Sequence, residues 1–379
     1  MGHVPEIVTP PSAPPIFQTT AFDIPDLDVL ADLHTGAAAG HIYTRDSNPN
    51  HKVLGESIAQ LEHAEAGAAF ASGMGAIAAI TLSLANAGDH ILVARSMYGI
   101  TLKLMRRLQK QFQIEVSWFD ATSIDSLKEN LRPDTKLCMV ETVSNPLLEV
   151  CDLPSLAAEL GDVPLIVDST FTTPELIRPI TMGAAIVVHS ASKYLNGHGD
   201  VMLGVVAGDN TCIRAIRATS SLFGQNANPF ASWLTQRGLR TLPLRMKHIA
   251  ETTTALAEFL SRHSACRRVY HPSLTEHPTN LVAARLLPQG CGGIVSFELQ
   301  GGGKDRVSAL MRAMPTIPFS ATLADARTTI SHPATTSHGF MTRQDRQDIG
   351  ITDELVRLSV GLETFEQLRD ELNTALNAM

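Results

Sequence analysis

The chain has 379 residues and a mass of 40.8 kDa, with 44% hydrophobic and 18% charged residues. This apolar content is enough for a core and excludes global disorder, and the length favours two domains. Proteins that bind nucleic acids or anionic membranes usually carry a basic surface, whereas this chain has a net charge of −8. We therefore expect it to bind neither nucleic acid nor a membrane.

The cysteine pattern indicates the redox setting. Five cysteines occur singly, with no CxxC pair: Cys138, Cys151, Cys212, Cys266 and Cys291. This argues against a disulfide framework and a structural zinc site. We therefore expect no metal and a cytoplasmic location. Residues 1–15 lack the basic and apolar blocks of a signal peptide.

The first part of the chain, residues 1–50, is predicted to be an arm. It is rich in Pro, Thr and Ala, and only a short helix near residues 26–33 is expected. An arm without a core usually lies on another surface, so we predict contact with a neighbouring subunit. The uncharged stretch at residues 66–88 is rich in Ala, Gly and Ser, and we interpret it as a buried helix after a glycine turn rather than a membrane span.

Residues 51–240 alternate between helical and strand patterns, which predicts a mostly parallel sheet covered on both faces. Such sheets bind ligands at the carboxyl ends of their strands. Helices are predicted at residues 52–64, 74–87 and 101–112, and strands at 90–94, 114–118, 137–141, 165–168, 186–189 and 203–207.

In residues 241–379 the regular alternation of helical and strand patterns ends. This part of the chain is predicted to form a smaller α+β domain. The boundary is expected near residues 237–245. Helices are predicted at residues 245–262, 306–314 and 365–378, and strands at 268–271, 293–299 and 356–360.

Two turns at the ends of predicted strands could bind a ligand. The turn Ser72-Gly73-Met74-Gly75 precedes a helical run, and its small residues would let backbone N–H groups approach an anion. Helix capping by Ser72 is the alternative. Tyr98 follows the next strand and would add an aromatic face, unless it is only a packing residue.

Three further strand ends carry polar groups. The segment 141–146 begins with Glu141 and contains Asn145. Asp168 ends an apolar strand, where an acid needs a cation or a protonated ring nitrogen, although it could also be a helix N-cap. Lys193 follows another buried strand, so desolvation would make its amine nucleophilic.

Glycine turn, aromatic ring, acid and lysine occur in that order on successive strands. Pyridoxal 5′-phosphate (PLP) needs these groups: a phosphate cradle, a ring stack, a carboxylate on the pyridine nitrogen and a Schiff-base lysine. A nicotinamide-binding enzyme would instead carry GxGxxG after the first strand, and none is present there.

Several motifs make the family recognisable. They are residues 15–22 (PIFQTTAF), 43–49 (YTRDSNP), 71–74 (ASGM), 141–146 (ETVSNP), 190–194 (SASKY), 237–242 (RGLRTL), 332–334 (HPA) and 357–363 (RLSVGLE). With them the chain resembles, nearly end to end, the Cys/Met-metabolism (transsulfuration) family of PLP enzymes. This group includes cystathionine γ-synthase, cystathionine γ-lyase, methionine γ-lyase and the O-acylhomoserine sulfhydrylases. The resemblance implies PLP fold type I, which is aspartate-aminotransferase-like: an arm, a mostly parallel seven-stranded sheet and a smaller C-terminal α+β domain.

The resemblance also implies residue roles. Lys193 would carry the cofactor and move protons, Asp168 would hold the ring nitrogen, and Tyr98 would stack on the ring and exchange a proton near the leaving group. The expected phosphate ligands are Gly73, Met74, Ser190 and Ser192, with Tyr43 and Arg45 reaching the phosphate of an adjacent subunit. The expected substrate-binding residues are Asn145, Thr322 and Arg357. The family likeness further implies a homotetramer, a dimer of dimers with shared active sites.

Some segments depart from the family pattern. Residues 322–325 read TLAD where many members have SLGG or SLGD. Ala321 stands where cystathionine γ-lyases tend to have glutamate, so recognition of the distal amino group of cystathionine is not expected. Ile100 stands where methionine γ-lyases often have a cysteine. Residues 223–230 also differ from the sequence that is common in the family.

The function that the resemblance implies is γ-elimination or γ-replacement on a homoserine- or methionine-derived amino acid. The products would be 2-oxobutanoate, ammonia and a thiol, or a thioether. One alternative is a β-elimination lyase acting on cystathionine or cysteine. Another is a catalytically weakened PLP-binding paralogue, against which the intact Tyr98, Asp168, Lys193 and Arg357 argue.

Overall fold

The computed structural model describes residue 9 and residues 11–379 and contains a large sheet with the strand order β1-β7-β6-β5-β4-β2-β3. Strands β2 to β6 are parallel, β7 is antiparallel to β6, and β1 is antiparallel to β7. The predicted mostly parallel seven-stranded sheet is therefore confirmed. Its strands are β1 (Ala66–Phe70), β2 (His90–Ala94), β3 (Glu115–Phe119), β4 (Thr135–Glu141), β5 (Leu165–Asp168), β6 (Ile186–Ser190) and β7 (Gly204–Gly208).

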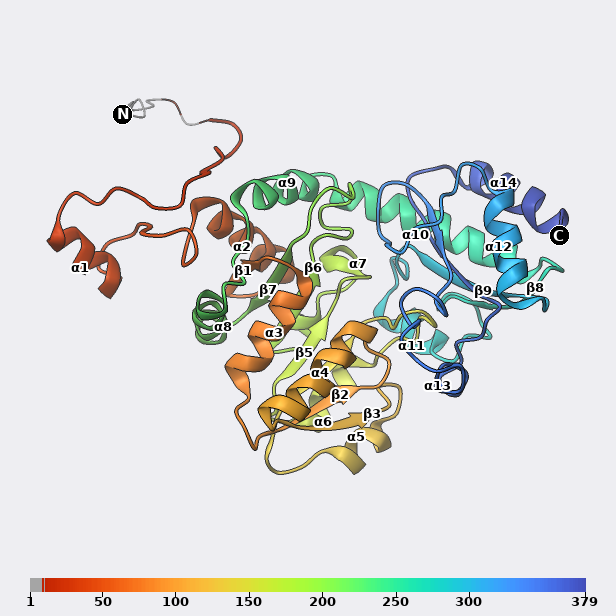
Figure 1. The fold of residues 1–379 in the computed structure, drawn as a ribbon, viewed down its shortest axis with the longest axis horizontal. Coiled ribbons are helices and arrows are strands. Elements are labelled where there is room, and N and C mark those ends of the chain that lie inside the picture. The colour runs from red at the N-terminus through yellow and green to blue at the C-terminus, as the bar shows by residue number, and fades with distance from the viewer. Residues whose placement is uncertain (1–8, 10) are drawn as a thin grey trace.

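Helices cover this sheet, and α3 and α4 lie across the viewer's side of it in Figure 1. Strands β2 and β7 are buried along their whole length, which explains why their sequences are continuously apolar rather than alternating. The elements around the sheet are α2 (Pro49–Glu62), α3 (Gly73–Leu84), α4 (Gly99–Phe112), α5 (Ile124–Asn130), α6 (Leu153–Leu160), α7 (Thr173–Leu176), the 3-10 helix η1 (Pro179–Met182), α8 (Asn210–Phe223) and α9 (Pro229–Leu239).

A second, antiparallel sheet with the order β10-β11-β9-β8 lies in the C-terminal part. Helix α10 runs from the first sheet towards the second (Figure 1), and it gives Met246 and Ile249 to one core and Leu256 and Leu260 to the other. The domain limit at residue 240 stays a prediction. The elements are α10 (Leu242–Ser261), β8 (Cys266–Tyr270), α11 (Asn280–Leu286), β9 (Ile294–Leu299), α12 (Gly303–Ala313), β10 (Thr329–Ser331), α13 (Arg343–Asp348), β11 (Leu355–Ser359) and α14 (Phe365–Asn377).

The arm extends away from the body of the molecule (Figure 1). Its one described helix, α1 (Leu27–Thr35), starts at Asp26, whose side chain accepts a hydrogen bond from the Val29 amide, and buries none of its residues. A few hydrogen bonds attach the arm to the body, such as that from Trp233 Nε1 to the Pro14 carbonyl at 2.9 Å. The arm was predicted to contact a neighbouring subunit, and this stays a prediction.

The stretch at residues 66–88 contains strand β1 as well as helix α3, so the interpretation of a helix after a turn was incomplete. The β1 sequence AGAAF has little intrinsic strand preference, and it forms a strand because it pairs with β7. Its Gly67 also lets helix α2 approach, since a Cβ there would lie 2.2 Å from the Gly55 carbonyl oxygen. Within the described residues, no helix is both long and apolar enough to cross a membrane.

Candidate active site

A cavity of about 360 Å³ lies at the carboxyl ends of β4, β5 and β6. The carboxyl ends of these parallel strands lie at one edge of the sheet, so residues far apart in the sequence meet there. Of the predicted site residues, the following line this cavity: Gly73, Met74, Tyr98, Asn145, Asp168, Ser190, Ser192 and Lys193.

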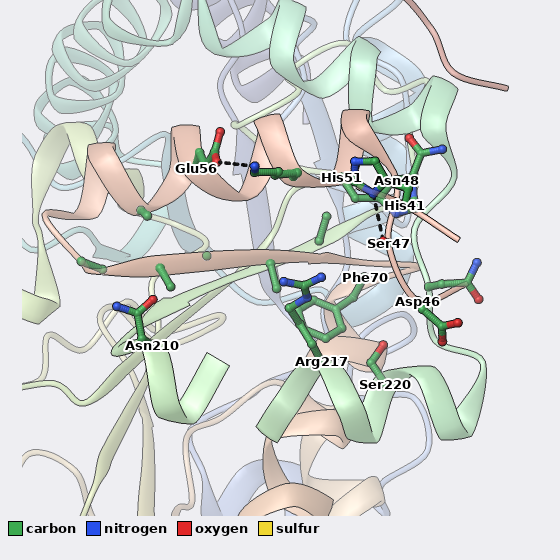
Figure 2. A pocket seen from close by; sticks show the side chains of 18 of the residues that line it. His41, Asp46, Ser47, Asn48, His51, Glu56, Phe70, Asn210, Arg217 and Ser220 are labelled. Atoms are coloured by element: carbon green, nitrogen blue, oxygen red, sulfur yellow. Dashed lines mark hydrogen bonds and ion pairs between the residues drawn. The ribbon is translucent and has the colours of Figure 1, made fainter. Parts of the chain in front are cut away.

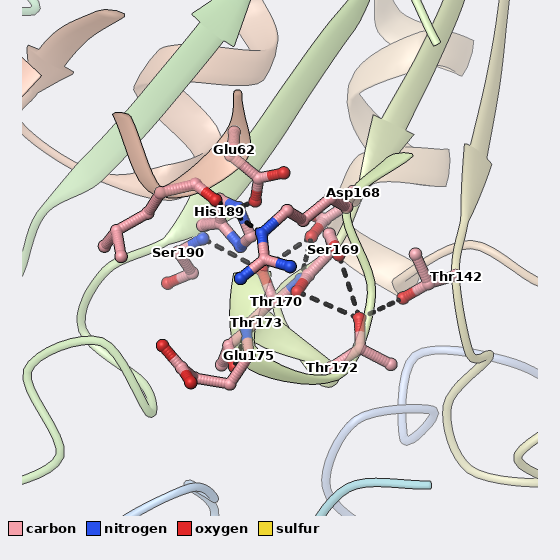
Figure 3. A network of polar contacts seen from close by, with 12 residues as sticks. Glu62, Thr142, Asp168, Ser169, Thr170, Thr172, Thr173, Glu175, His189 and Ser190 are labelled. Carbon is pink, nitrogen blue, oxygen red and sulfur yellow. Dashed lines mark hydrogen bonds and ion pairs between the residues drawn. The ribbon is translucent and has the colours of Figure 1, made fainter. Parts of the chain in front are cut away.

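Asp168 is held by a short network at the end of β5 (Figure 3). Its Oδ1 accepts hydrogen bonds from the Thr170 amide at 3.0 Å and from Thr170 Oγ1 at 2.5 Å. Thr170 Oγ1 in turn accepts the Ser190 amide at 2.9 Å. Burial raises the pKa of Asp168, and the Thr170 hydrogen bonds oppose this shift. The N-cap alternative fails, because the N-cap of α7 is Thr172.

Lys193 is a half-buried amine beside this acid. Its Nζ donates a hydrogen bond to Thr322 Oγ1 at 3.1 Å. Burial lowers the pKa of Lys193, and the nearby charge of Arg357 lowers it further. A larger fraction of the amine is therefore neutral at a given pH than in a free lysine, which suits a nucleophile or a base.

The start of α3 forms a cradle for an anion. Ser72 caps the helix by accepting the Gly75 amide at 3.0 Å, which leaves the amides of Gly73 and Met74 at the positive end of the helix. A Cβ at Gly73 would lie 3.0 Å from Cβ of Ser190, so glycine lets the helix end approach that serine closely. The capping alternative and the anion site are thus compatible.

Ser192 completes the cradle from the Lys193 side. Its Oγ accepts the Leu203 amide at 2.9 Å, which fixes the hydroxyl in the cavity wall.

Arg357 does not line the cavity itself; it is buried beside it, and only 2% of the residue is exposed. It donates through Nη1 to Asn145 Oδ1 at 3.0 Å and through Nη2 to the Thr322 carbonyl at 3.3 Å. Its Nε has no hydrogen-bond partner among the described residues. Burial lowers the pKa of Arg357 to about 10, so it is still a cation at neutral pH. A buried guanidinium with a free N–H suits a carboxylate ligand.

Tyr98 is the N-cap residue of α4 and lines the cavity. Burial raises the pKa of its phenol, so the hydroxyl keeps its proton over the neutral range. Its backbone amide donates to Glu141 Oε1 at 2.7 Å. The tyrosine is therefore held at a fixed position at the rim.

The predicted arm residues lie elsewhere. Tyr43 and Arg45 do not line the cavity of Lys193. Arg45 lines a separate cavity of about 600 Å³ between α2, β1 and α8, shown in Figure 2, and its guanidinium lies 5.2 Å from the centre of the Tyr43 ring. The expected contact of these two residues with an adjacent subunit stays a prediction.

The cavity wall also contains residues that the sequence analysis did not name, among them Thr170, Val201 and Met202. The spacing of Thr170 two residues after an acid at a strand end is a usable signal, because that spacing forms an Asx turn. Within the described part of the chain, no cluster of three His, Cys, Asp or Glu residues could hold a metal ion.

Comparison with known proteins agrees with this geometry. The profile of the family described as Cys/Met metabolism PLP-dependent enzyme matches residues 3–377. The chain belongs to this family. It is a PLP-dependent enzyme of carbon–sulfur amino-acid metabolism.

Curated members of the Cys/Met metabolism family cover almost the whole chain. It is 38% identical to the O-succinylhomoserine sulfhydrylase of Pseudomonas aeruginosa, over 96% of this chain and 90% of that protein. It is 37% identical to an L-methionine gamma-lyase of Fusobacterium nucleatum, over 96% and 93%. It is also 37% identical to the cystathionine gamma-lyase of Bacillus subtilis, over 96% and 93%.

Solved structures of the same family confirm the fold. The cystathionine gamma synthase of Xanthomonas oryzae, in complex with aminoacrylate and cysteine, superposes with a TM-score of 0.90 at 35% identity, covering 96% of this chain and 92% of that one. A putative O-acetylhomoserine (thiol)-lyase of Campylobacter jejuni, with a pyridoxyl-lysine phosphate, gives 0.90 at 27% identity, covering 96% and 95%.

The cavity fits PLP by its own chemistry. It offers a helix N-terminus with a glycine approach for the phosphate, an acid for the ring nitrogen, an aromatic ring and a desolvated lysine. These are the groups that the cofactor requires.

Proposed function

We propose that the enzyme catalyses γ-elimination or γ-replacement on a homoserine- or methionine-derived amino acid. The observation that carries this proposal is the convergence of Lys193, Asp168 and Tyr98 on one cavity, with the Arg357–Asn145 pair beside it. The relatives named as methionine gamma-lyase and O-succinylhomoserine sulfhydrylase support the same class of reaction.

When bound, PLP withdraws electrons from the amino-acid substrate, so that protons on its α and β carbons can be removed. The first turn of α3 with Ser190 and Ser192 would hold its phosphate, Asp168 its ring nitrogen and Lys193 its aldehyde carbon.

Lys193 would accept and return the substrate protons. Its lowered pKa raises the fraction of neutral amine, and Thr322 Oγ1 accepts one N–H and so orients the lone pair. A base of this kind works best when its pKa lies near the working pH.

The substrate carboxylate would bind at Arg357 and Asn145. The free Nε of Arg357 provides the N–H, and the Nη1 bond to Asn145 keeps the guanidinium in place. Tyr98, protonated because burial raises its pKa, would donate a proton to the leaving group.

The γ-substituent would be small and without a positive charge. Leu323, Met202 and Val201 give the cavity apolar walls, and position 321 carries an alanine rather than a carboxylate. Substrates with a methylthio or acyloxy group fit this chemistry better than cystathionine. β-Elimination from cystathionine or cysteine is the second candidate, because Lys193 would remove the same α proton in both reactions.

We further propose a cytoplasmic homotetramer, a dimer of dimers, in which Tyr43 and Arg45 serve the site of the adjacent subunit. The separation of Arg45 from the cavity of Lys193 within one chain supports this shared arrangement.

The cofactor part is tested by the visible absorption of the purified protein after reconstitution with PLP. We expect a band that borohydride abolishes and that Lys193→Ala lacks. A wild-type protein without such a band would refute the proposal.

The reaction is tested by incubation with methionine, O-acetylhomoserine, O-succinylhomoserine and cystathionine, with and without a thiol, followed by mass spectrometry. We expect 2-oxobutanoate without the thiol or a thioether with it. Pyruvate from cystathionine as the sole product would establish β-elimination instead.

A further inference from the structure

Glu141 is a carboxyl group of the cavity wall to which the proposed function gives no role. It is the last residue of β4, and in the parallel register it is paired with Asp168, the last residue of β5. Two carboxyl side chains therefore stand side by side at one edge of the sheet.

Glu141 connects three segments of the site. Its Oε1 accepts the backbone amide of Tyr98 at 2.7 Å, and the backbone amide of Asn145 lies close enough to lower the pKa of this carboxyl. Tyr98 is the N-cap of α4, and its own side chain makes no capping bond. One carboxyl thus fixes the residue expected to stack on the cofactor and the residue expected to bind the substrate carboxylate.

The surroundings of Glu141 and Asp168 favour the charged form of each carboxyl to a different degree. Two ionised carboxylates side by side in a buried environment repel each other, which disfavours ionisation of both at once. Asp168 accepts two hydrogen bonds from Thr170, and the nearby His189 lowers its pKa. Burial and the neighbouring Asp168 raise the pKa of Glu141 well above its ordinary value, opposed only by the two backbone amides.

We propose that Glu141 is a positioning residue that acts as a neutral carboxylic acid. It holds Tyr98 and Asn145 through their backbone amides and leaves the negative charge of the pair on Asp168, opposite the ring nitrogen of the cofactor. A neutral acid can still accept both amides through its carbonyl oxygen. This inference rests on the proposed function, since it assumes the roles given to these three neighbours.

The test compares Glu141→Gln with Glu141→Ala. Glutamine keeps the size, the carbonyl acceptor and the neutrality, whereas alanine removes the acceptor. Glu149→Gln is the matched control, because Glu149 follows on the same loop but does not line the cavity. For each protein we would measure the PLP dissociation constant, the bound-cofactor absorption across about pH 6–9, and KM and kcat.

We expect Glu141→Gln and Glu149→Gln to stay within about twofold of wild type in all four readouts, with an unchanged pH titration of the band. We expect Glu141→Ala to weaken PLP binding and raise KM by about tenfold each, because the Tyr98 amide loses its acceptor and the Asn145 amide loses a neighbouring carboxyl.

A Glu141→Gln protein as impaired as Glu141→Ala, or with a shifted pH titration, would overturn the neutral acid. Wild-type behaviour of Glu141→Ala would overturn the positioning role. If the alanine variant does not fold, the glutamine titration decides. If the wild type itself shows no PLP band, the proposed function fails instead, and thermal melting of the PLP-free proteins still tests positioning, with Glu141→Ala expected to melt below Glu141→Gln.

Discussion

Ala324 occupies a backbone conformation that usually requires glycine. Its φ of +65° lies in the left-handed region, and its side chain is buried. This conformation lets the Ala324 amide donate to Ser359 Oγ at 2.7 Å, and it lies two residues after Thr322, the partner of Lys193. The family departure at this position is thus a strained residue close to the partner of the Lys193 amine.

We predict that Ala324→Gly stabilises the protein by about 1 kcal/mol, because glycine has no Cβ to clash in this conformation. Urea unfolding of the PLP-free protein would measure it. Ala326→Gly is the control, because Ala326 is not in the left-handed region, and it is expected to be neutral or destabilising. Equal effects of the two substitutions would contradict the strain.

The lowered pKa of Lys193 gives a prediction on pH dependence. Arg357→Gln removes a positive charge, so the pKa of Lys193 rises and less neutral amine is present at any given pH. Capture of PLP by the PLP-free protein should then need a higher pH than in wild type. Arg357→Lys keeps the charge and should keep the wild-type pH profile. Coincident profiles for all three proteins would show that this charge does not act on Lys193.

At the scale of elements, strand register builds the site. Glu141 is paired with Asp168, and Asp168 with Val188, so β4 and β5 end level and β6 continues two residues further, to Ser190. Helix α2 is joined to β6 by the contact of Glu62 Oε1 with His189 Nε2 at 2.6 Å, and both side chains are fully buried (Figure 3). This contact joins the start of the domain to the strand that precedes Lys193.

We predict that Glu62→Ala destabilises the protein by about 3–5 kcal/mol, because it leaves a buried polar partner uncompensated. The double variant Glu62→Leu with His189→Phe should cost less than the sum of the single changes. Denaturant unfolding of the wild type, Glu62→Leu, His189→Phe and the double variant would show this coupling. Strictly additive effects would indicate that the two groups do not stabilise each other.

At the scale of the whole molecule, the arm packs little against the rest of its own chain. Helix α1 buries no residue, yet the segment after it carries the predicted phosphate ligands Tyr43 and Arg45. We therefore propose that an adjacent subunit provides a further surface that stabilises the arm.

We predict that Arg45→Ala weakens PLP retention although Arg45 lies outside the cavity of Lys193. Mixed subunits give the sharper experiment. Co-refolding of Arg45→Ala with Lys193→Ala chains should restore activity, because one site of each hybrid dimer then combines an intact Lys193 with an intact Arg45. No gain on mixing, in species that sedimentation shows to be hybrids, would contradict a shared site.

The sequence alone predicted the residue types at the strand ends, and with them the cofactor. Buried parallel strands have continuous apolar runs, so their ends can be located without knowing their order, and the groups that follow must meet at one edge. Asp168, Lys193 and Tyr98 could be found in this way. Strand β1 could not, because small residues form a strand there only through pairing with β7.

Tertiary structure decided the contacts between distant segments. Thr322 reaches Lys193 across 129 positions, and Arg357 reaches Asn145 across 212, because the fold brings the loop before β10 and strand β11 next to the residues that follow β6 and β4. The left-handed Ala324 and the pairing of Glu141 with Asp168 were likewise invisible in the sequence. Local patterns encode burial and secondary structure, whereas hydrogen bonds and charge coupling depend on distances that only the packed chain defines.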